Sequence, residues 1–441
     1  METVDLIRTN ILAFCKYINR DFKIGQHHYR IAKRLNDIAR GIPTRVIIAM
    51  PPRHGKSYLC SQHFPAFYMG KNPSNNVILT GYAQSLVEDF GTYNRNLLLH
   101  PSYQEIFETR LDDSVTAKKR FSTKQDGHFY AVGRGGAITG RGGDLIIVDD
   151  LFKNDQEAQS GHIRHQLQEW WKNTLRTRLM PNGSIIIINT RWHHEDLIGF
   201  VMENSKENWE YIKMDAISPS GDALWPEMWP IDELENIKRE IGSRAFEALY
   251  QQEPSIAEGN IIKREWVKRY KEIYRRDDEV ITADLSMKGG VRSDNVAIQY
   301  WVRQAEKYMY VDGIKGKWDF METVRVFQDF CAKYPHVGKI KVEDKANGPA
   351  LYSALREHIP GISMWTPKTS KEGRVNAVSP LYEAGLVEYP ETFDGEDEYF
   401  RELYEFPYSK HDDQVDATTM ALLLLKKTKN TFMIPIGSRD Y

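Results

Sequence analysis

The apolar run RVIIAM leads directly into a loop, MPPRHGKS, that could bind phosphate. Gly55, Lys56 and Ser57 match the end of a phosphate-binding loop, whereas Met50 stands where the first glycine usually does. In such a loop, backbone N–H groups and the start of the next helix bind phosphate oxygens. The lysine adds positive charge beside the β and γ phosphates, and the next hydroxyl binds Mg²⁺. The pattern predicts a nucleotide site formed by Arg53, His54, Gly55, Lys56, Ser57 and Tyr58.

A second apolar run, DLIIVDD, ends in the carboxylates Asp149 and Asp150. On a strand beside the loop, Asp149 is expected near Mg²⁺ and Asp150 near the water that attacks the phosphate. A buried strand with a solvated acidic end would have the same pattern, but the phosphate-binding loop upstream favours catalysis. ATPases of this kind usually carry glutamate at the second position. Asp150 is therefore a candidate for the catalytic base, with a shorter side chain than the usual glutamate.

Other polar residues are candidates for the same site. Thr190 follows the apolar run GSIIIINT and could sense the γ-phosphate. Arg53 could reach the transferring phosphoryl group within the subunit, and Arg141 in ITGRGGD could enter a neighbouring subunit's site. An ion pair with Asp144 is the alternative for Arg141. Upstream, Gln26 is a candidate for contacting the edge of the adenine base.

Four acids of the second half of the chain suggest a second chemistry. Asp284 lies late in the strand-like run ITADLS, Glu343 ends KVED, and Asp412 and Asp413 open the final helical stretch. Cleavage of a phosphodiester by two metal ions needs three or four carboxylates that converge. Each acid alone would be an ordinary surface residue, but the expected topology brings these elements together.

Neighbouring acids could replace these residues or shape the metal site. Asp344 would point to the opposite face of a regular strand from Glu343, which favours Glu343 as the ligand. Asp416 lies one helical turn from Asp412 and Asp413, which suggests a supporting role. Asp294 is a further candidate.

Two basic segments are candidates for contact with a nucleic acid backbone. Residues 263–276, KREWVKRYKEIYRR, hold seven basic residues against two acids, and form either a linker that contacts phosphates or a solvated helix face. The stretch TPKTSKEGR carries Lys368, Lys371 and Arg374 in a loop beside the acidic cluster, which either follows a DNA backbone towards the metals or is flexible and binds nothing.

The elements that carry these residues predict an α/β chain of two domains. Near-continuous apolar runs separated by helical stretches predict a mostly parallel, doubly wound sheet at residues 1–252, of the P-loop (RecA/ASCE-like) ATPase type. Three hairpin-linked strands followed by alternating helices and strands predict an RNase H-like domain with a mixed sheet at 277–441. Residues 253–276 are expected to form a basic linker.

Composition is compatible with this organisation. The chain has 441 residues, 41% of them hydrophobic, and a net charge of −2 that makes no global case for nucleic acid binding. Cys15, Cys60 and Cys331 form neither a disulfide framework nor a zinc site, which fits a reducing cytoplasm. No apolar run reaches the ~20 residues of a membrane span, and the N-terminal stretch has no signal-peptide pattern.

In this order, PPRHGKS, DLIIVDD, NTRW, ALYQQEP, VEDKANG and HDDQVDA resemble the large terminase subunits of tailed bacteriophages. The resemblance implies that ATP hydrolysis drives double-stranded DNA into an empty capsid and that the nuclease cuts the concatemer at initiation and termination. It assigns the phosphate loop to Lys56 and Ser57, coupling to Thr190, and the nuclease metals to Asp284, Glu343 and Asp412 or Asp413. The implied cofactors are ATP with Mg²⁺ and, at the nuclease site, two Mg²⁺ or Mn²⁺ ions.

The same resemblance implies partners: the portal protein, a small terminase subunit, and further copies in a ring, commonly a pentamer, from subunits that are often monomers in solution. Such proteins work in the host cytoplasm, docked transiently on the procapsid, and are not expected in the mature virion. A helicase–nuclease of repair or defence is the main alternative, but it would normally carry a second RecA-like core. A structural capsid component is a weaker alternative, because it would need neither the loop nor the acids.

Overall fold

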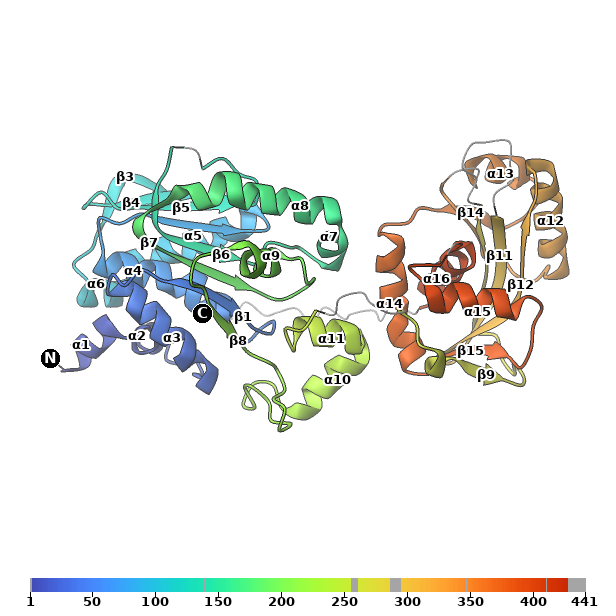
Figure 1. Cartoon of the computed structure of the whole chain (residues 1–441), viewed down its shortest axis with the longest axis horizontal. Helices are drawn as coiled ribbons and strands as arrows, with labels where there is room; N and C mark the ends of the chain where they lie inside the picture. Colours follow the sequence, from blue (N-terminus) through green and yellow to red (C-terminus); the bar gives the residue numbers. More distant parts are fainter. Residues whose placement is uncertain are drawn as a thin grey trace. The chain divides into compact units, whose positions relative to one another are not determined.

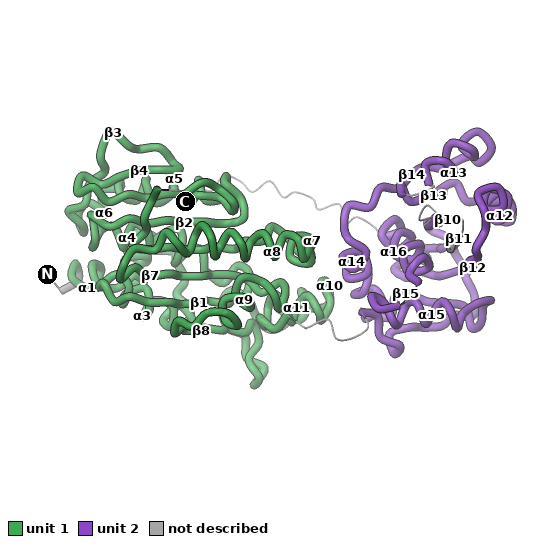
Figure 2. Tube along the Cα trace, turned by 45° about the horizontal axis from the view of Figure 1, so that its top comes forward, with its two compact units in different colours: residues 1–256 green, residues 257–441 purple. Residues whose placement is uncertain are grey.

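A computed structural model of the chain describes residues 2–138, 140–254, 261–285, 295–345, 348–409 and 411–426. The chain divides into two compact units, Met1–Ile256 and Ala257–Tyr441 (Figure 2). Among the described residues, no helix combines the length and the apolar character that a membrane crossing requires.

Unit 1 is built on an eight-stranded sheet in the order β3-β4-β5-β2-β6-β7-β1-β8. The pairs among β5, β2, β6, β7, β1 and β8 are parallel, whereas β3–β4 and β4–β5 are antiparallel. The sheet is therefore mostly parallel, as the sequence predicts. The strands are β1 Arg45–Ala49, β2 Val77–Gly81, β3 Leu111–Ala117, β4 Arg120–Thr123, β5 His128–Gly133, β6 Gly143–Asp149, β7 Leu179–Asn189 and β8 Glu210–Lys213.

Helices cover both faces of this sheet, as Figure 1 shows. Alternate residues of β6 enter different cores: Leu145 and Ile147 pack with α2 to α6, whereas Ile146 and Val148 pack with α7 to α9. Burial on both faces explains why these strands are almost wholly apolar. The helices are α1 Glu2–Thr9, α2 Ile11–Ile18, α3 Gln26–Ala39, α4 Phe64–Lys71, α5 Gln84–Leu99, α6 Pro101–Ile106, α7 Asp155–Gln159, α8 Gly161–Trp170, α9 Leu197–Asn204, α10 Ile231–Ile241 and α11 Ser243–Leu249, with the short turns η1 Tyr58–His63, η2 Trp171–Leu175 and η3 Arg176–Arg178.

Unit 2 contains a seven-stranded mixed sheet in the order β14-β13-β10-β11-β12-β15-β9. The meander β10-β11-β12 is antiparallel, and β13 lies parallel to β10. One face packs against α12 and α13, and the other against α14, α15 and α16. The elements are η4 Arg264–Trp266, β9 Lys268–Tyr270, β10 Asp278–Asp284, β11 Asn295–Gln304, β12 Lys307–Lys317, α12 Phe320–Lys333, β13 Ile340–Glu343, α13 Gly348–Leu355, β14 Ile362–Trp365, α14 Lys371–Glu383, β15 Val387–Pro390, α15 Glu396–Glu405 and α16 Asp413–Leu425.

The basic segment 263–276, expected to form a linker or a solvated helix face, instead supplies the edge strand β9, which pairs with β15. Its cations lie over aromatic rings of unit 2: Arg264 over Tyr404, and Arg269 over Phe400. Part of this segment therefore belongs to the folded unit, because its side chains cover aromatic surface.

Candidate nucleotide site and carboxylate cluster

The phosphate-binding loop lies between β1 and η1 and is held from behind by two histidines. The Nε2 atoms of His27 and His28 each lie 3.0 Å from the carbonyl oxygen of His54. Gly25 N–H donates to His28 Nδ1 (2.9 Å), so His28 carries its proton on Nε2 and donates it to that carbonyl. Gly55 has a φ of +90°, and a Cβ there would collide with His28 Nε2. Glycine is therefore required by the conformation and by the close approach of the imidazole.

Lys56 connects the loop to the ends of two neighbouring strands. Its side chain is almost fully buried, and Nζ donates to Thr190 Oγ1 and lies 3.1 Å from Asp150 Oδ2. The backbone N–H of Thr190 donates to Asp150 Oδ1 at 2.8 Å. Asp150 has a φ of +37°, which is uncommon for a residue with a side chain. The predicted lysine, base and coupling residue thus form one connected group.

Asp149 lies fully buried next to this group. Its carboxylate accepts hydrogen bonds from Ser57 Oγ (3.0 Å) and Ser61 Oγ. Burial, and then the charge of Asp150, raise the pKa of Asp149 to about 7. The serine and the carboxylate offer oxygen atoms, which are the ligands that Mg²⁺ prefers.

A cavity of about 670 Å³ opens in front of these residues. Phe22, Trp225 and Met228 form an apolar part of its wall, and the ring of Phe22 stacks on that of Tyr58 with centroids 4.4 Å apart. A flat, apolar base could pack there. The predicted residues in the lining are Arg53, Gly55, Lys56, Ser57, Tyr58, Asp149, Asp150 and Thr190.

Two predicted residues lie outside this lining. His54 is buried behind the loop, where its ring stacks on Trp229. Gln26 begins α3, is exposed, and is not among the residues that line the cavity, so the structure gives no support for an adenine contact there. The sequence reasoning missed Phe22 and Trp225, which belong to no recognisable motif.

Arg141 does not pair with Asp144 among the described contacts. Its guanidinium lies 4.7 Å from the ring centroid of Tyr130, and Asp144 Oδ2 accepts the Asn76 N–H at 2.7 Å. The alternative of an ion pair with Asp144 is therefore not found among the described contacts, and the trans role of Arg141 stays a prediction.

In unit 2, Asp284, Glu343 and Asp416 converge. All three are buried, and their ligand oxygens lie within 4.8 Å of one another. Parallel β10 and β13 place Asp284 and Glu343 at adjacent strand ends, because Ala283 is in register with Val342. Helix α16 packs across β10 and brings Asp416 to the same point.

The other acids surround this group. Asp413 is buried, and its charge contributes to raising the pKa of Asp284. Asp412 is partly exposed and pairs with Lys371. Asp344 accepts a hydrogen bond from Thr366 Oγ1 at 3.0 Å, away from the cluster. The structure thus places Asp416, expected in a supporting role, with Asp284 and Glu343; Asp294 lies outside the described residues.

Two cations of α14 form ion pairs with the cluster, and Lys345 Nζ also lies 3.2 Å from Glu343 Oε1. Arg374 Nη1 lies 3.0 Å from Glu343 Oε1 and Nη2 lies 2.5 Å from Asp416 Oδ1. Lys371 Nζ lies 2.6 Å from Asp416 Oδ2 and from Asp412 Oδ2. Lys371 and Arg374 therefore lie beside the acids, as expected, but on α14 and paired with them, not in a loop. Contact of this stretch with DNA stays a prediction, and Lys368, just before α14, is exposed.

Burial is the main reason why the pKa of Asp284 is raised well above its ordinary value, followed by the charges of Asp416 and Glu343. Carboxylates at such close range repel unless cations lie between them. Their buried oxygens match the ligands and spacing of a divalent metal site.

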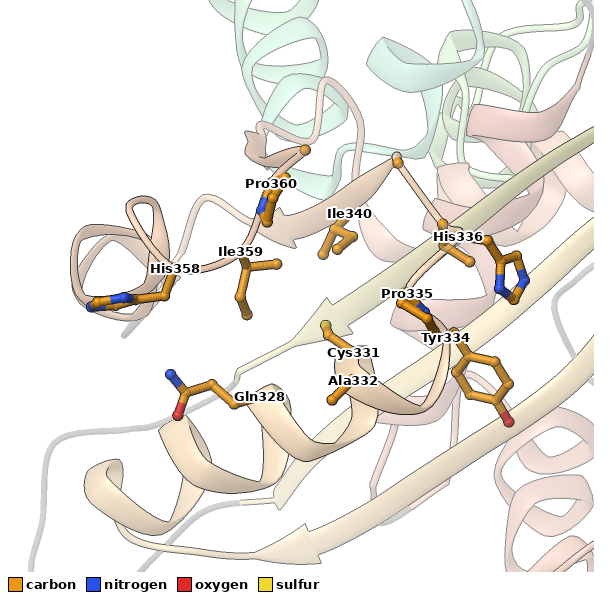
Figure 3. Close-up of a pocket in the computed structure, with 13 residues that line it drawn as sticks. Gln328, Cys331, Ala332, Tyr334, Pro335, His336, Ile340, His358, Ile359 and Pro360 are labelled. Atoms are coloured by element: carbon orange, nitrogen blue, oxygen red, sulfur yellow. The ribbon is translucent and has the colours of Figure 1, made fainter.

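A separate cavity of about 650 Å³ lies at the other end of β13 from Glu343 (Figure 3). Cys331 of α12, Ile340 of β13 and Ile359 face it, and His336 and His358 stand at its sides. The described residues of its lining come from the second half of α12, the start of β13 and two loops, and none of them is a carboxylate. It is therefore distinct from the carboxylate cluster.

Comparisons with known proteins agree with this arrangement. Residues 47–269 match the family model "Terminase large subunit, T4likevirus-type, N-terminal", and residues 281–425 match "Terminase RNaseH-like domain". No curated protein sequence matches the chain.

Two solved structures have a similar fold, and both are of the large terminase from a thermophilic bacteriophage. The structure in complex with ADP is 13% identical, with a TM-score of 0.54, and the match covers 92% of this chain and 100% of that chain. The structure in complex with ATP-gamma-S is also 13% identical, with a TM-score of 0.53, and the match covers 90% of this chain and 98% of that chain. These matches confirm the expected fold class, and since the N-terminal model alone spans half of the sequence, the chain belongs to the family of terminase large subunits.

Proposed function

We propose that this protein uses ATP hydrolysis in unit 1 to move double-stranded DNA into an empty capsid, and a two-metal nuclease in unit 2 to cut it. The observation that carries the proposal is the presence, in one terminase chain, of the connected Lys56–Asp150–Thr190 group and the buried trio Asp284, Glu343 and Asp416. A helicase–nuclease is disfavoured because unit 1 holds one eight-stranded core, and unit 2 has a different topology.

In unit 1, ATP would lie in the 670 Å³ cavity with its phosphates on the loop. Lys56 would leave Asp150 to contact the phosphates, and Ser57 with Asp149 would hold Mg²⁺. Asp150, released from the lysine, would then be free to accept a proton from the attacking water. The backbone N–H of Thr190 donates to Asp150, which supports the proposal that this change would reach β7 through Thr190.

In unit 2, Asp284, Glu343 and Asp416 would hold the divalent ions, with Asp413 beside them. Bound metal ions supply charge stabilisation and an activated water in phosphodiester cleavage. The chain's own contribution is to fix the carboxylates: β10 and β13 set two of them, and Thr282 Oγ1 donates to the Ala417 carbonyl (2.9 Å), which fastens α16.

The expected partners are the portal protein, a small terminase subunit and further copies of this chain in a ring. These complexes are expected to form in the host cytoplasm during capsid assembly. The direct test is packaging by the purified protein into purified empty capsids. We expect protection of double-stranded DNA from added nuclease with ATP and none without it. Failure to protect DNA in the presence of ATP, portal-bearing capsids and the small subunit would refute the packaging function.

Binding of Mg²⁺–nucleotide is expected to release a proton from Asp149 in a pH-dependent way. With a pKa of about 7, this carboxyl is mostly protonated at pH 6 and mostly ionised at pH 8. Since metal ligands bind as carboxylates, release should approach one proton at pH 6 and about 0.1 at pH 8, and affinity should fall as pH drops below 7. Calorimetry in buffers of different ionisation enthalpy measures this release. Equal release at both pH values, or the same release from Asp149→Asn, would contradict it.

Arg141 is proposed to act on the site of a neighbouring subunit. Arg141→Ala and Lys56→Ala subunits should each be inactive in the ring, while a mixture should recover ATP hydrolysis, because some sites then combine an intact Lys56 with a neighbour's intact Arg141. Lys56→Ala mixed with Asp150→Asn is the matched control, since both changes affect the same subunit's site and no recovery is expected. Recovery no greater than in that control would exclude the trans role.

A further inference from the structure

Helix α14 presents two cations to the carboxylate cluster, and they differ in exposure and geometry. The Arg374 side chain is 1% exposed, bridges Glu343 and Asp416, and lies 5.5 Å from the Trp365 ring centroid. The Lys371 side chain is 38% exposed and reaches Asp412 and Asp416 from the edge of the cluster. A planar guanidinium bound on several sides is fixed, whereas an ammonium group on a flexible stem at the edge can leave.

The two oxygens of Asp416 are also used differently. Arg374 binds Oδ1 with hydrogen-bond geometry. Oδ2 is buried, and its partner is Lys371, whose Nζ lies 2.6 Å away. The partner of this oxygen is thus the ammonium group at the edge of the cluster, so the oxygen could bind a different cation once the lysine leaves.

The position of Lys371 Nζ overlaps that of a metal ion bound to the same oxygens. Mg²⁺ lies about 2.1 Å from its oxygen ligands. A nitrogen atom 2.6 Å from both Asp416 Oδ2 and Asp412 Oδ2 lies in the space that such an ion would take. A lysine and a divalent ion cannot both occupy it.

We propose that Lys371 is an exchangeable counter-ion: it pairs with Asp412 and Asp416 when the cluster holds no metal, and a divalent ion must displace it. This inference rests on the proposed metal-dependent nuclease of unit 2. Arg374 stays in place and keeps Glu343 and Asp416 together, so the cluster remains assembled during the exchange. The lysine thereby weakens metal binding and sets the metal concentration at which the site fills.

The test is calorimetric titration of the nucleotide-free full chain with MnCl₂. Lys371→Met should bind Mn²⁺ about 10-fold more tightly than the unchanged protein, a coupling of ordinary size. The matched control is Lys368→Met, which removes the same charge from an exposed position of the same segment and should change the dissociation constant less than about twofold. The binding event is assigned to unit 2 by its loss in Asp284→Asn.

A second readout is thermal unfolding. Without metal, Lys371→Met should melt at a lower temperature than Lys368→Met, because the acids lose a counter-charge. MnCl₂ should raise the melting temperature of Lys371→Met more than that of Lys368→Met. Unchanged or weaker Mn²⁺ binding by Lys371→Met would overturn the exchange while leaving the metal site in place. If Asp284→Asn removes no Mn²⁺ binding from the unchanged protein or from Lys371→Met, the cluster is not a metal site. Both the proposed metal site and the proposed exchange would then be refuted.

Discussion

Lys56→Ala is expected to lower ATP hydrolysis at least about 100-fold while metal-dependent DNA cutting continues. Lys56 is the buried cation that contacts both Asp150 and Thr190, and loss of one preorganised group that stabilises developing charge costs roughly 10²–10³ in rate. The cutting residues belong to unit 2, which has its own sheet and its own cores, so their geometry does not depend on this side chain. Phosphate release and plasmid cleavage by the same preparation measure the two activities.

The matched control is Lys172→Ala, which removes a lysine that pairs with Glu169 on the surface of unit 1. Surface pairs of this kind contribute little to stability, so both activities should stay within about twofold of the unchanged protein. Simultaneous loss of ATP hydrolysis and DNA cutting in Lys56→Ala would show that the two sites are not separable. Hydrolysis by Lys56→Ala at the level of the control would remove Lys56 from the catalytic group.

The elements that carry the chemistry could be predicted because each has a local signal. The apolar runs ending at Ala49, Asp149 and Asn189 become the adjacent strands β1, β6 and β7, since strands buried on both faces must be apolar along their length. The order of the meander and of β13 likewise predicts that Asp284 and Glu343 meet. Topology thus brings distant residues together when each residue ends a recognisable strand.

Residues that act through tertiary contacts were not predictable in this way. Phe22 and Trp225 reach the nucleotide cavity from segments without a motif. The sequence placed Lys371 and Arg374 beside the acids but as a basic loop, and the packing of α14 against α16 makes them direct ion-pair partners of these acids. Charge and hydrophobicity in the sequence do not encode which partner a side chain meets, so these roles follow from the fold alone.

The position of Asp416 shows the same limit. Helical periodicity relates Asp416 to Asp412 and Asp413, but it does not decide which of the three faces β10. In the structure Asp416 and Asp413 are buried, whereas Asp412 lies at the edge of the cluster and forms an ion pair with Lys371. DNA cutting by the asparagine variant of each residue can therefore rank their contributions. The loss expected for Asp284→Asn is the reference for this comparison.

Asp284→Asn is expected to reduce metal-dependent DNA cutting at least about 100-fold without affecting ATP hydrolysis. Asp284 is buried beside Glu343 and Asp416, and loss of a direct ligand should exceed the roughly 10–100-fold effect typical of residues that only support ligands. Because burial and the neighbouring carboxylates disfavour the charge of Asp284, and so raise its pKa, a neutral amide should leave the metal-free melting temperature unchanged or higher. Plasmid cleavage with Mg²⁺ or Mn²⁺, together with thermal unfolding, separates lost chemistry from lost folding.

Asp278→Asn is the matched control, because Asp278 opens the same strand and pairs with Lys339 at 2.8 Å, at the other end of β10. It should cut DNA within about twofold of the unchanged protein. In the same assay Asp416→Asn should approach the loss seen for Asp284→Asn, and Asp412→Asn should retain more activity, since its partner is the exchangeable Lys371. Full cutting by Asp284→Asn would exclude the cluster as the nuclease site, whereas a larger loss in Asp412→Asn than in Asp416→Asn would make the edge carboxylate the direct ligand.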